Sequence, residues 1–417
     1  MGAILLMGAI VGQPILTACS PVHDEVDPTT TAAVAVVPTP SDPAASGVTR
    51  NVMAQLAAPG GLILGQEEED VSSVRVNGLD RTSSDFATLG SAPPALVSYE
   101  LSHLHKASKT MFDREAFRGG ASKLRELVRE KRRRGVLVSL VWHMRCPKAS
   151  ASDPDRYRPD DCPAYKLEEF LPRKQNGQVG ALSGEWHAML DELAAMLATF
   201  VDDAGKTIPV QLRPFHEFTG DWFWWGRQND PRTYRAVWID MVERVRARGA
   251  HQALWVFCPD KPTDAWQVSR GGDFEAYYPG DRHVDVIGFD RYDAHDGTFA
   301  AGYAADLLRI GAFAEAHHKI AAVTEVGLDL GRHGVGADPS WFTRAMAAPL
   351  LETPAGRRFS YVALWRNAPW EKYVPEPGDG AVAEDFRTMT RDPRLVLDDD
   401  RRDLYAPVAA SSGGPSG

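Results

Sequence analysis

Short apolar runs recur along this 417-residue chain, and most of them are continuous rather than alternating with polar positions. Continuous apolar strands are typical of a parallel sheet that is buried on both faces. We therefore interpret the runs as strands of such a sheet. The eight predicted strands span residues 61–65, 95–99, 136–142, 209–214, 253–257, 284–289, 320–324 and 361–365.

Amphipathic segments with helical spacing separate these runs. The clearest of them span residues 120–133, 183–202, 231–248 and 300–317. Eight strands that alternate with helices predict an α/β fold of the (β/α)8 TIM-barrel type with loop insertions. The barrel would occupy residues 56–400 as one domain, and the chain shows no internal repeat beyond the strand–helix unit.

Polar side chains gather directly after the apolar runs. Barrel active sites lie at the carboxyl ends of the strands, so this placement predicts a functional barrel mouth. The residues are Gln66, Glu67 and Glu68 after the first run, Glu100 after the second, His143 after the third, His216 and Glu217 after the fourth, Asp290, Tyr292 and Asp293 after the sixth, Glu325 after the seventh, and Arg366 and Asn367 after the eighth. A doubly wound sheet would not need polar residues after nearly every strand.

Glu217 and Glu325 are the candidates for chemistry at this mouth. Glu217 lies in RPFHEFTGDWFWWG, residues 213–226, and Glu325 lies in VTEVG. Two carboxyl groups facing one cleft suit glycoside hydrolysis, in which one protonates the leaving oxygen and the other acts at the anomeric carbon. For a single glutamate, an ion pair with an arginine such as Arg213 is the simpler interpretation. The zinc-protease pattern HExxH is absent, because Gly220 stands at its fifth position.

Several segments resemble glycoside hydrolase family 26, in order along the barrel. RPFHEFTGDWFWWG resembles the family's acid/base segment and VTEVG its nucleophile segment. ILGQEE, SLVWHMRCP, FDRYD and ALWRNAP resemble the segments of the first, third, sixth and eighth strands. The resemblance covers residues 60–395. One departure lies beside the acid/base position, where the family usually has Met-Asn and this chain has Phe218 and Thr219.

The resemblance implies the two catalytic roles and the residues around them. Glu217 would be the acid/base and Glu325 the nucleophile of a retaining mechanism that passes through a covalent glycosyl-enzyme. The implied substrate-binding residues are His143, His216, Trp222, Tyr292, Trp365 and Arg213. Arg213 would lie beneath the catalytic pair and hold the carboxylates ionised, with a simple salt bridge as the alternative.

The other implied roles follow the chemistry of each side chain. His216 would orient the acid/base or contact the sugar, and His143 would line the subsite where the sugar distorts. Tyr292 would hydrogen-bond the nucleophile. Trp222 and Trp365 would stack on hexose rings, because the apolar face of a hexose packs well on an indole. The last two tryptophans of the WFWWG cluster are equally compatible with packing beneath the loop.

The resemblance further implies the substrate class. Most members of the family are endo-acting β-1,4-mannanases, so mannan, galactomannan or glucomannan is the expected polysaccharide. Mixed-linkage β-glucan and β-1,3-xylan are alternatives within the family, and a non-catalytic glycan-binding barrel is an alternative of another class. No metal or organic cofactor is implied, and a monomer is expected.

The charge of the chain argues against one class of partner. The net charge is −10, and the marked basic run at residues 131–134 closes a predicted helix, where cations are favourable. Nucleic-acid binding is therefore not expected, and a neutral ligand fits better.

The N-terminal region predicts export. Residues 3–18 are apolar and end in Leu-Thr-Ala before Cys19, which resembles a bacterial lipobox with a lipidated cysteine. An ordinary signal peptide cut near Cys19 is the alternative. We expect residues 1–19 to be a lipoprotein signal peptide, 20–55 a disordered tether and 401–417 a disordered tail. The protein would then be a membrane-anchored lipoprotein at the cell surface or in the periplasm, or a secreted protein.

Three cysteines remain once Cys19 is set aside. Cys146 and Cys162 flank a loop rich in Asp, Pro and Arg, and an exported protein can form disulfides. A bridge between them would brace that loop, although spacing alone does not fix connectivity. Cys258 is expected to be a small buried residue at a strand end.

Overall fold

The computed structural model describes residues 38–58, 60–71, 84–105, 110–147, 162, 166–399 and 402–408. All of them belong to one compact unit, Val37–Gly417. The expected signal peptide with Cys19, and residues 409–417 of the expected tail, lie outside the described part of the chain. Among the described helices, none combines the length and the apolar character needed to cross a membrane.

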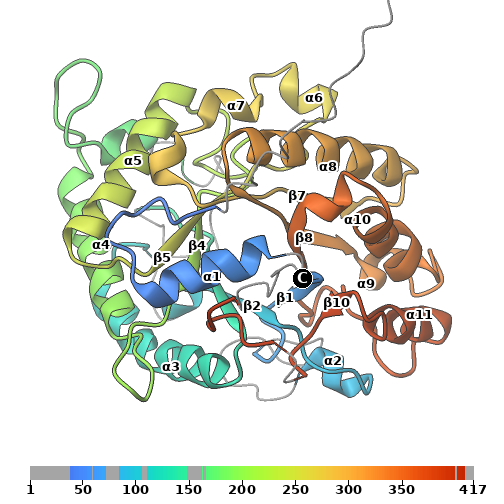
Figure 1. Cartoon of the computed structure of the whole chain (residues 1–417). Coiled ribbons are helices and arrows are strands. Elements are labelled where there is room, and N and C mark those ends of the chain that lie inside the picture. Colours follow the sequence, from blue (N-terminus) through green and yellow to red (C-terminus); the bar gives the residue numbers. More distant parts are fainter. Residues whose placement is uncertain are drawn as a thin grey trace, which may run out of the picture. The chain divides into compact units, whose positions relative to one another are not determined.

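Parallel strands close into a barrel in the described chain (Figure 1). They are β1 (Leu62–Glu67), β2 (Leu96–Glu100), β3 (Leu137–Trp142), β4 (Val210–Pro214), β5 (Ala253–Phe257), β6 (Val286–Ile287), β7 (Asp290–Asp293), β8 (Ile320–Leu328) and β9 (Phe359–Leu364). The ring is closed by β9, which pairs with both β8 and β1. A short tenth strand, β10 (Leu395–Val396), pairs with the start of β1. The predicted (β/α)8 barrel is confirmed.

The sixth barrel position differs from the single strand predicted at residues 284–289. It consists of two short strands, β6 and β7, and both pair with β8. Between them the backbone still bonds to the chain at and after β5, because Gly288 N–H donates to the Phe257 carbonyl and Asp290 N–H to the Pro259 carbonyl. The break therefore changes the pairing with β8 while the ring stays closed.

Helices follow most strands and cover the outside of the barrel. The longer ones are α1 (Gly47–Ala57), α3 (Arg114–Arg133), α4 (Ser183–Ala198), α5 (Pro231–Ala247), α8 (Phe299–Ala316) and α11 (Ala381–Thr390). The short α-helices are α2 (Asp85–Thr88), α6 (Ala265–Val268), α7 (Phe274–Tyr277), α9 (Leu330–His333) and α10 (Ala348–Glu352). Single 3-10 turns occur at η1 (Leu101–His105), η2 (Leu167–Phe170), η3 (Asp281–His283) and η5 (Gly356–Arg358), and a π-helical turn at η4 (Trp341–Ala347).

Helix α5 shows how local sequence sets these elements. The Asp230 carboxylate caps its first turn by accepting from Thr233 N–H at 3.0 Å, and Pro231 occupies a first-turn position where no N–H is needed. One face then buries Val237 and Met241, among other apolar residues. An apolar stripe of this kind holds a helix against the barrel wall.

The prediction of a disordered tether over residues 20–55 is wrong for its described part. Residues 47–57 form helix α1, which begins at the Ser46 cap and contacts β8 and β9. Val52 and Met53 are fully buried there. Burying that apolar surface offsets the cost of ordering the segment, which the Pro- and Thr-rich composition upstream obscured.

The tail prediction is likewise wrong for residues 402–408. Leu404 and Tyr405 are buried, and the Tyr405 hydroxyl donates to the Val136 carbonyl at 3.1 Å. The burial of these two side chains and the hydrogen bond hold this short segment against the barrel.

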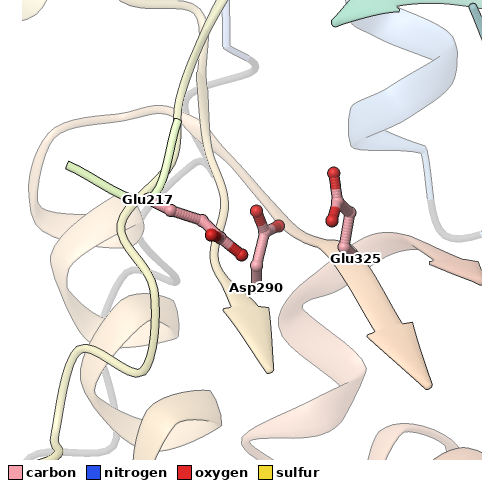
Figure 2. Close-up of side chains that lie close together, drawn as sticks. All are labelled: Glu217, Asp290 and Glu325. Atoms are coloured by element: carbon pink, nitrogen blue, oxygen red, sulfur yellow. The ribbon is translucent and has the colours of Figure 1, made fainter. Parts of the chain in front are cut away.

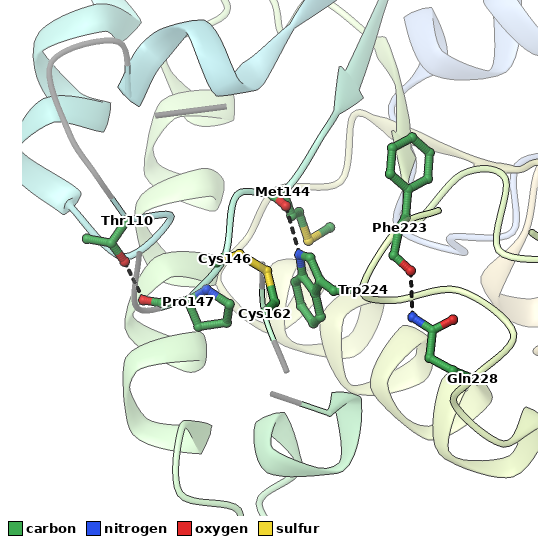
Figure 3. Close-up of a disulfide and its surroundings, with 8 residues drawn as sticks. All are labelled: Thr110, Met144, Cys146, Pro147, Cys162, Phe223, Trp224 and Gln228. Carbon is green, nitrogen blue, oxygen red and sulfur yellow. Dashed lines mark hydrogen bonds between the residues drawn. A yellow bond between two sulfur atoms is a disulfide. The ribbon is translucent and has the colours of Figure 1, made fainter. Parts of the chain in front are cut away.

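Cys146 and Cys162 form a disulfide (Figure 3). The bridge lies beside the loop that carries Glu217, because the Trp224 indole N–H donates to the Met144 carbonyl at 2.8 Å. Cys258 is buried and free, as expected.

Replacing Cys146 and Cys162 together with serine is expected to lower the free energy of unfolding by about 3 kcal/mol, the value for closing a loop of this length. Urea unfolding of the oxidised wild type and the double variant measures the difference. In excess reductant the two proteins should unfold alike. Equal stability under oxidising conditions would contradict the prediction.

Candidate active site

Three carboxyl groups meet at the carboxyl ends of the strands (Figure 2). Glu217 comes just after β4, Asp290 begins β7 and Glu325 lies in β8. One oxygen from each lies within 4.8 Å of the others. Asp290 and Glu325 are also direct partners in the register of β7 with β8. The two glutamates that were expected to share the barrel mouth are therefore brought together.

The backbone around Glu217 is held in an unusual conformation. Phe215 and Glu217 have positive φ angles of 49° and 53°, which non-glycine residues rarely adopt. Glu217 N–H donates to the Cys258 carbonyl at 2.8 Å, which ties this turn to the chain after β5. Conformations of this kind persist where the surrounding structure fixes them, commonly at functional sites.

Arg213 links two of the three carboxyl groups. Its side chain is 2% exposed, and it donates to Asp290 at 2.8 Å and to Glu325. The hydroxyl of Thr324 also donates to Asp290, at 2.6 Å. Charge-assisted bonds of this kind stabilise the ionised carboxylate and fix its orientation. The simple ion pair and the catalytic placement that were considered for Arg213 are therefore compatible.

Glu217 and Glu325 have different surroundings. Glu325 accepts a hydrogen bond from the Tyr292 hydroxyl at 2.5 Å, in addition to that from Arg213. Glu217 accepts one from the Trp222 indole N–H at 2.6 Å. Burial raises the pKa of Glu217 well above its usual value, and the nearby carboxylates Asp260, Asp290 and Glu325 raise it further. The arrangement therefore favours a protonated Glu217 beside a Glu325 that is paired with Arg213, which suits acid catalysis combined with nucleophilic attack.

The crowding of buried carboxyl groups at this site also favours a protonated Glu217. Burial also raises the pKa of Asp290, although Arg213 acts in the opposite direction. The pKa of Glu67, at the end of β1, is raised well above its usual value by burial and by the nearby Glu68 and Glu325. A single guanidinium cannot balance this many carboxylates, so protonating some of them is the least costly solution.

Trp222 reaches Glu217 because Gly220 leaves room for its ring. A Cβ atom at position 220 would lie 2.3 Å from the Trp222 indole. Trp222 is partly exposed, as a sugar platform must be. Trp224 and Trp225, in contrast, are at most 1% exposed and donate their indole N–H groups to backbone carbonyls, so they pack beneath the loop.

Two histidines form a chain beside the catalytic carboxyl groups. His143 Nδ1 contacts the Glu100 carboxylate, and His143 Nε2 lies 3.0 Å from His216 Nε2. His216 is fully buried, and burial lowers its pKa well below the usual value, so its ring is neutral. The ring of Trp365 lies 5.9 Å from His143 and 6.3 Å from Tyr292, between centroids. All eight predicted site residues thus lie around one mouth.

Asp290 and Glu100 are site residues that the sequence did not single out. Each was noted only as a polar residue after a strand. The available signal was Arg213, because a buried arginine requires carboxylate partners and Glu325 alone leaves one side of it unpaired. Nothing in the sequence pointed to Glu100 as the partner of His143.

The carboxyl triplet also has the spacing of a cation site within the described residues. Carboxylate oxygens are suitable ligands for Mg²⁺ or Ca²⁺. Arg213 already donates to two of the three groups and supplies positive charge there.

Replacing Arg213 with alanine is expected to destabilise the fold by about 3–5 kcal/mol, because it leaves buried carboxylates without a cation. Chemical denaturation at neutral pH measures this loss. Arg213→Lys is the matched control, since it keeps the charge and should recover part of the stability. An alanine variant as stable as the wild type would contradict the ion-pair interpretation.

Comparison with known proteins supports one family. The model of glycosyl hydrolase family 26 matches residues 118–328. A mannan endo-1,4-beta-mannosidase of Bifidobacterium adolescentis is 27% identical over 252 residues, covering 56% of this chain and 25% of that protein. A mannan endo-1,4-beta-mannosidase of Bacillus subtilis is 29% identical over 245 residues, covering 55% of this chain and 59% of that protein.

A solved structure agrees over a larger part of the chain. A GH26 beta-mannanase from Bacteroides ovatus superimposes with a TM-score of 0.69 at 25% identity, covering 87% of this chain and 97% of the other. The two curated relatives are matched over 25% and 59% of their lengths, so the similarity concerns part of each. The family model covers about half of this chain, and it includes the segments of both glutamates; the chain belongs to glycosyl hydrolase family 26.

Proposed function

We propose that the chain is a retaining, endo-acting glycosidase that cleaves β-1,4-mannosidic bonds in mannan, galactomannan or glucomannan. The observation that carries the mechanism is the pair Glu217 and Glu325, with carboxylate oxygens within 4.8 Å of each other. Retaining glycosidases hold their two carboxyl groups about 5–5.5 Å apart, whereas inverting ones need about 6.5–9.5 Å. The substrate class is supported by the names of the curated relatives.

In the first step, Glu325 attacks the anomeric carbon and the glycosidic C–O bond breaks. Glu217 gives its proton to the departing oxygen, so the leaving chain departs as a neutral alcohol. The product is a glycosyl ester of Glu325. Because its pKa is raised, Glu217 is protonated before this step and can donate the proton. Arg213 and Tyr292 hold Glu325 in place.

In the second step, a water molecule attacks the same carbon. Glu217, now a carboxylate, takes a proton from that water, and the bond to Glu325 breaks. Glu325 returns to its carboxylate form and Glu217 to its acid form. Two inversions at one carbon retain its configuration.

The surrounding residues fit substrate-binding roles. Trp365 offers an indole surface beside the nucleophile, and Trp222 offers one beside the acid. The neutral His216, bonded to His143, is placed to contact hydroxyl groups of the reacting sugar without adding charge. A neutral polysaccharide is consistent with the acidic chain.

Mixed-linkage β-glucan and β-1,3-xylan remain the alternatives within the family. Thr219 stands where the family usually has Asn, beside the acid/base position. Its hydroxyl is buried and donates to the Asp260 carbonyl at 2.8 Å, so it braces the loop rather than reaching a sugar directly. A binding-only barrel is disfavoured, because simple binding does not require a protonated Glu217 beside an ion-paired Glu325.

Release of reducing ends by the purified chain tests the proposal. Linear mannan, galactomannan, mixed-linkage β-glucan and β-1,3-xylan are offered in parallel. Activity on the mannans alone supports the proposed substrate class. Activity only on the glucan or the xylan keeps the mechanism and overturns the specificity, and inactivity on all four overturns the proposal.

We also propose that the protein is exported as a monomer and anchored through a lipid on Cys19. The support is the apolar run of residues 3–18 that ends at this cysteine. In the native host, Cys19→Ala is expected to move the enzyme from the membrane fraction to the soluble fraction. An unchanged distribution would contradict the anchor.

A further inference from the structure

Trp370 is a large apolar side chain that lies exposed on a hydrogen-bonded turn. It is 64% exposed, on the loop after β9. Ala368 and Glu371 exchange two backbone hydrogen bonds, of 2.9 and 3.2 Å, around it. Asn367, 2% exposed, braces the same loop by donating to the Val374 carbonyl at 2.9 Å. The fold therefore fixes the backbone here and presents the indole to solvent.

A continuous row of side chains connects Trp370 to the catalytic site. Trp365 lies 6.3 Å from Tyr292, the partner of the nucleophile. The Arg366 guanidinium lies 5.3 Å from the Trp365 ring and 6.0 Å from the Trp370 ring. Arg366 is itself held by Glu68 at 2.7 Å and by the carboxylate of residue 371 at 2.9 Å. Trp370 is thus the outer end of a row that begins at the reacting centre.

The position of the row decides which part of a polysaccharide it would meet. Glu217 protonates the leaving oxygen, so the departing chain lies toward the loops after β4 and β5. The row belongs to β9, which pairs with β8, the strand of Glu325. It therefore runs on the side of the sugar that is transferred to the nucleophile.

We propose that Trp370 forms an additional sugar-binding site on this side of the cleft, where its indole stacks on a hexose beyond the one bound at Trp365. The ligand is a neutral β-1,4-linked polysaccharide, and this inference rests on the proposed function. An indole face suits the apolar face of a hexose, and stacking needs no charge. Single exposed apolar residues are common, but this one lies on a braced turn at the end of a row that starts at the catalytic site. Such a site adds binding energy only for chains long enough to reach it.

The test compares variants on substrates of increasing length. Wild type, Trp370→Ala, Trp370→Phe and Leu308→Ala are assayed on linear β-1,4-mannooligosaccharides of three to six sugars. Leu308 is the matched control, because it is 60% exposed on α8, outside the mouth. Trp370→Ala is expected to lower kcat/KM on the longest substrate about tenfold and to leave the shortest unchanged. Trp370→Phe should recover most of the loss, and Leu308→Ala should match the wild type at every length.

Two results overturn the inference while the proposed function stands. One is a Trp370→Ala variant that equals the wild type at every length, and the other is an equal loss at every length, which would indicate a structural role. If the wild type cleaves none of these substrates, the proposed function fails instead. Affinity electrophoresis in gels containing mannan or mixed-linkage glucan then tests the proposed sugar-binding site. If the polysaccharide retards the wild-type protein and retards Trp370→Ala less, the site is supported. Any other outcome overturns it.

Discussion

Glu325→Ala is expected to lower kcat on mannan by about 10⁴-fold or more, as removal of a nucleophile does in other enzymes with covalent intermediates. The variant lacks the atom that bonds to the sugar, so no glycosyl-enzyme can form. Its affinity for the polymer should be kept, because the tryptophans and histidines of the mouth are unchanged. Reducing-end assays measure the first effect, and affinity electrophoresis in mannan gels measures the second.

Glu384→Ala provides the control for Glu325→Ala. Glu384 is an exposed glutamate on α11, and its replacement should leave kcat unchanged. Added azide is expected to restore turnover in Glu325→Ala with formation of the glycosyl azide, because a small anion fits the space left by the carboxylate. Turnover of Glu325→Ala within tenfold of wild type would contradict its assignment as nucleophile.

Glu217→Gln is expected to lower kcat on mannan by about 10²- to 10⁴-fold, the usual contribution of a general acid. The amide keeps the shape and the bond from Trp222 but has no proton to give. On an aryl β-mannoside with a good leaving group the first step needs no acid, so the loss should then appear in the second step. A burst of aryl alcohol followed by slow turnover is the expected observation. The same loss on both substrates, without a burst, would contradict the acid/base role.

The raised pKa of Glu217 also sets the direction of the pH dependence. The active form carries a proton on Glu217, so kcat/KM should fall as the pH rises through that raised pKa. Glu217→Gln has no proton to lose at this position, and its alkaline limb should disappear. If the alkaline limb of the kcat/KM profile persists in Glu217→Gln, that limb reports the titration of another group.

The barrel could be predicted from the sequence because its strands are buried on both faces. Continuous apolar runs such as residues 136–142 and 253–257 mark β3 and β5 almost to the residue. The break between β6 and β7 could not be found in this way, because an apolar run carries no information about which neighbour it pairs with. Helix α1 was missed for a related reason. Its apolar face becomes evident only once there is a barrel for it to contact.

The structure brings the predicted site residues together at one mouth, but the sequence did not show how they are connected. Glu217 and Glu325 stand in recognisable segments directly after strands, so their meeting at one mouth follows from the topology. Asp290 lies beside Glu325, where Arg213 reaches both, because of the register of β7 with β8, and no local pattern encodes that register. Trp370 was not singled out in the sequence, because the sequence alone does not show whether a tryptophan side chain is exposed or buried.

The N-terminal segment of the described chain joins the barrel at the end away from the catalytic pair. Ser41 N–H donates to the Asp285 carboxylate, and the Asp42 carboxylate contacts His251. Asp285 directly precedes β6 and His251 lies just before β5, so both mark the amino ends of inner strands, whereas Glu217 and Glu325 lie at the carboxyl ends. A resin or a fusion partner attached ahead of residue 38 is therefore joined to the rear of the enzyme. Immobilisation through that end should leave the cleft open to long polysaccharide chains.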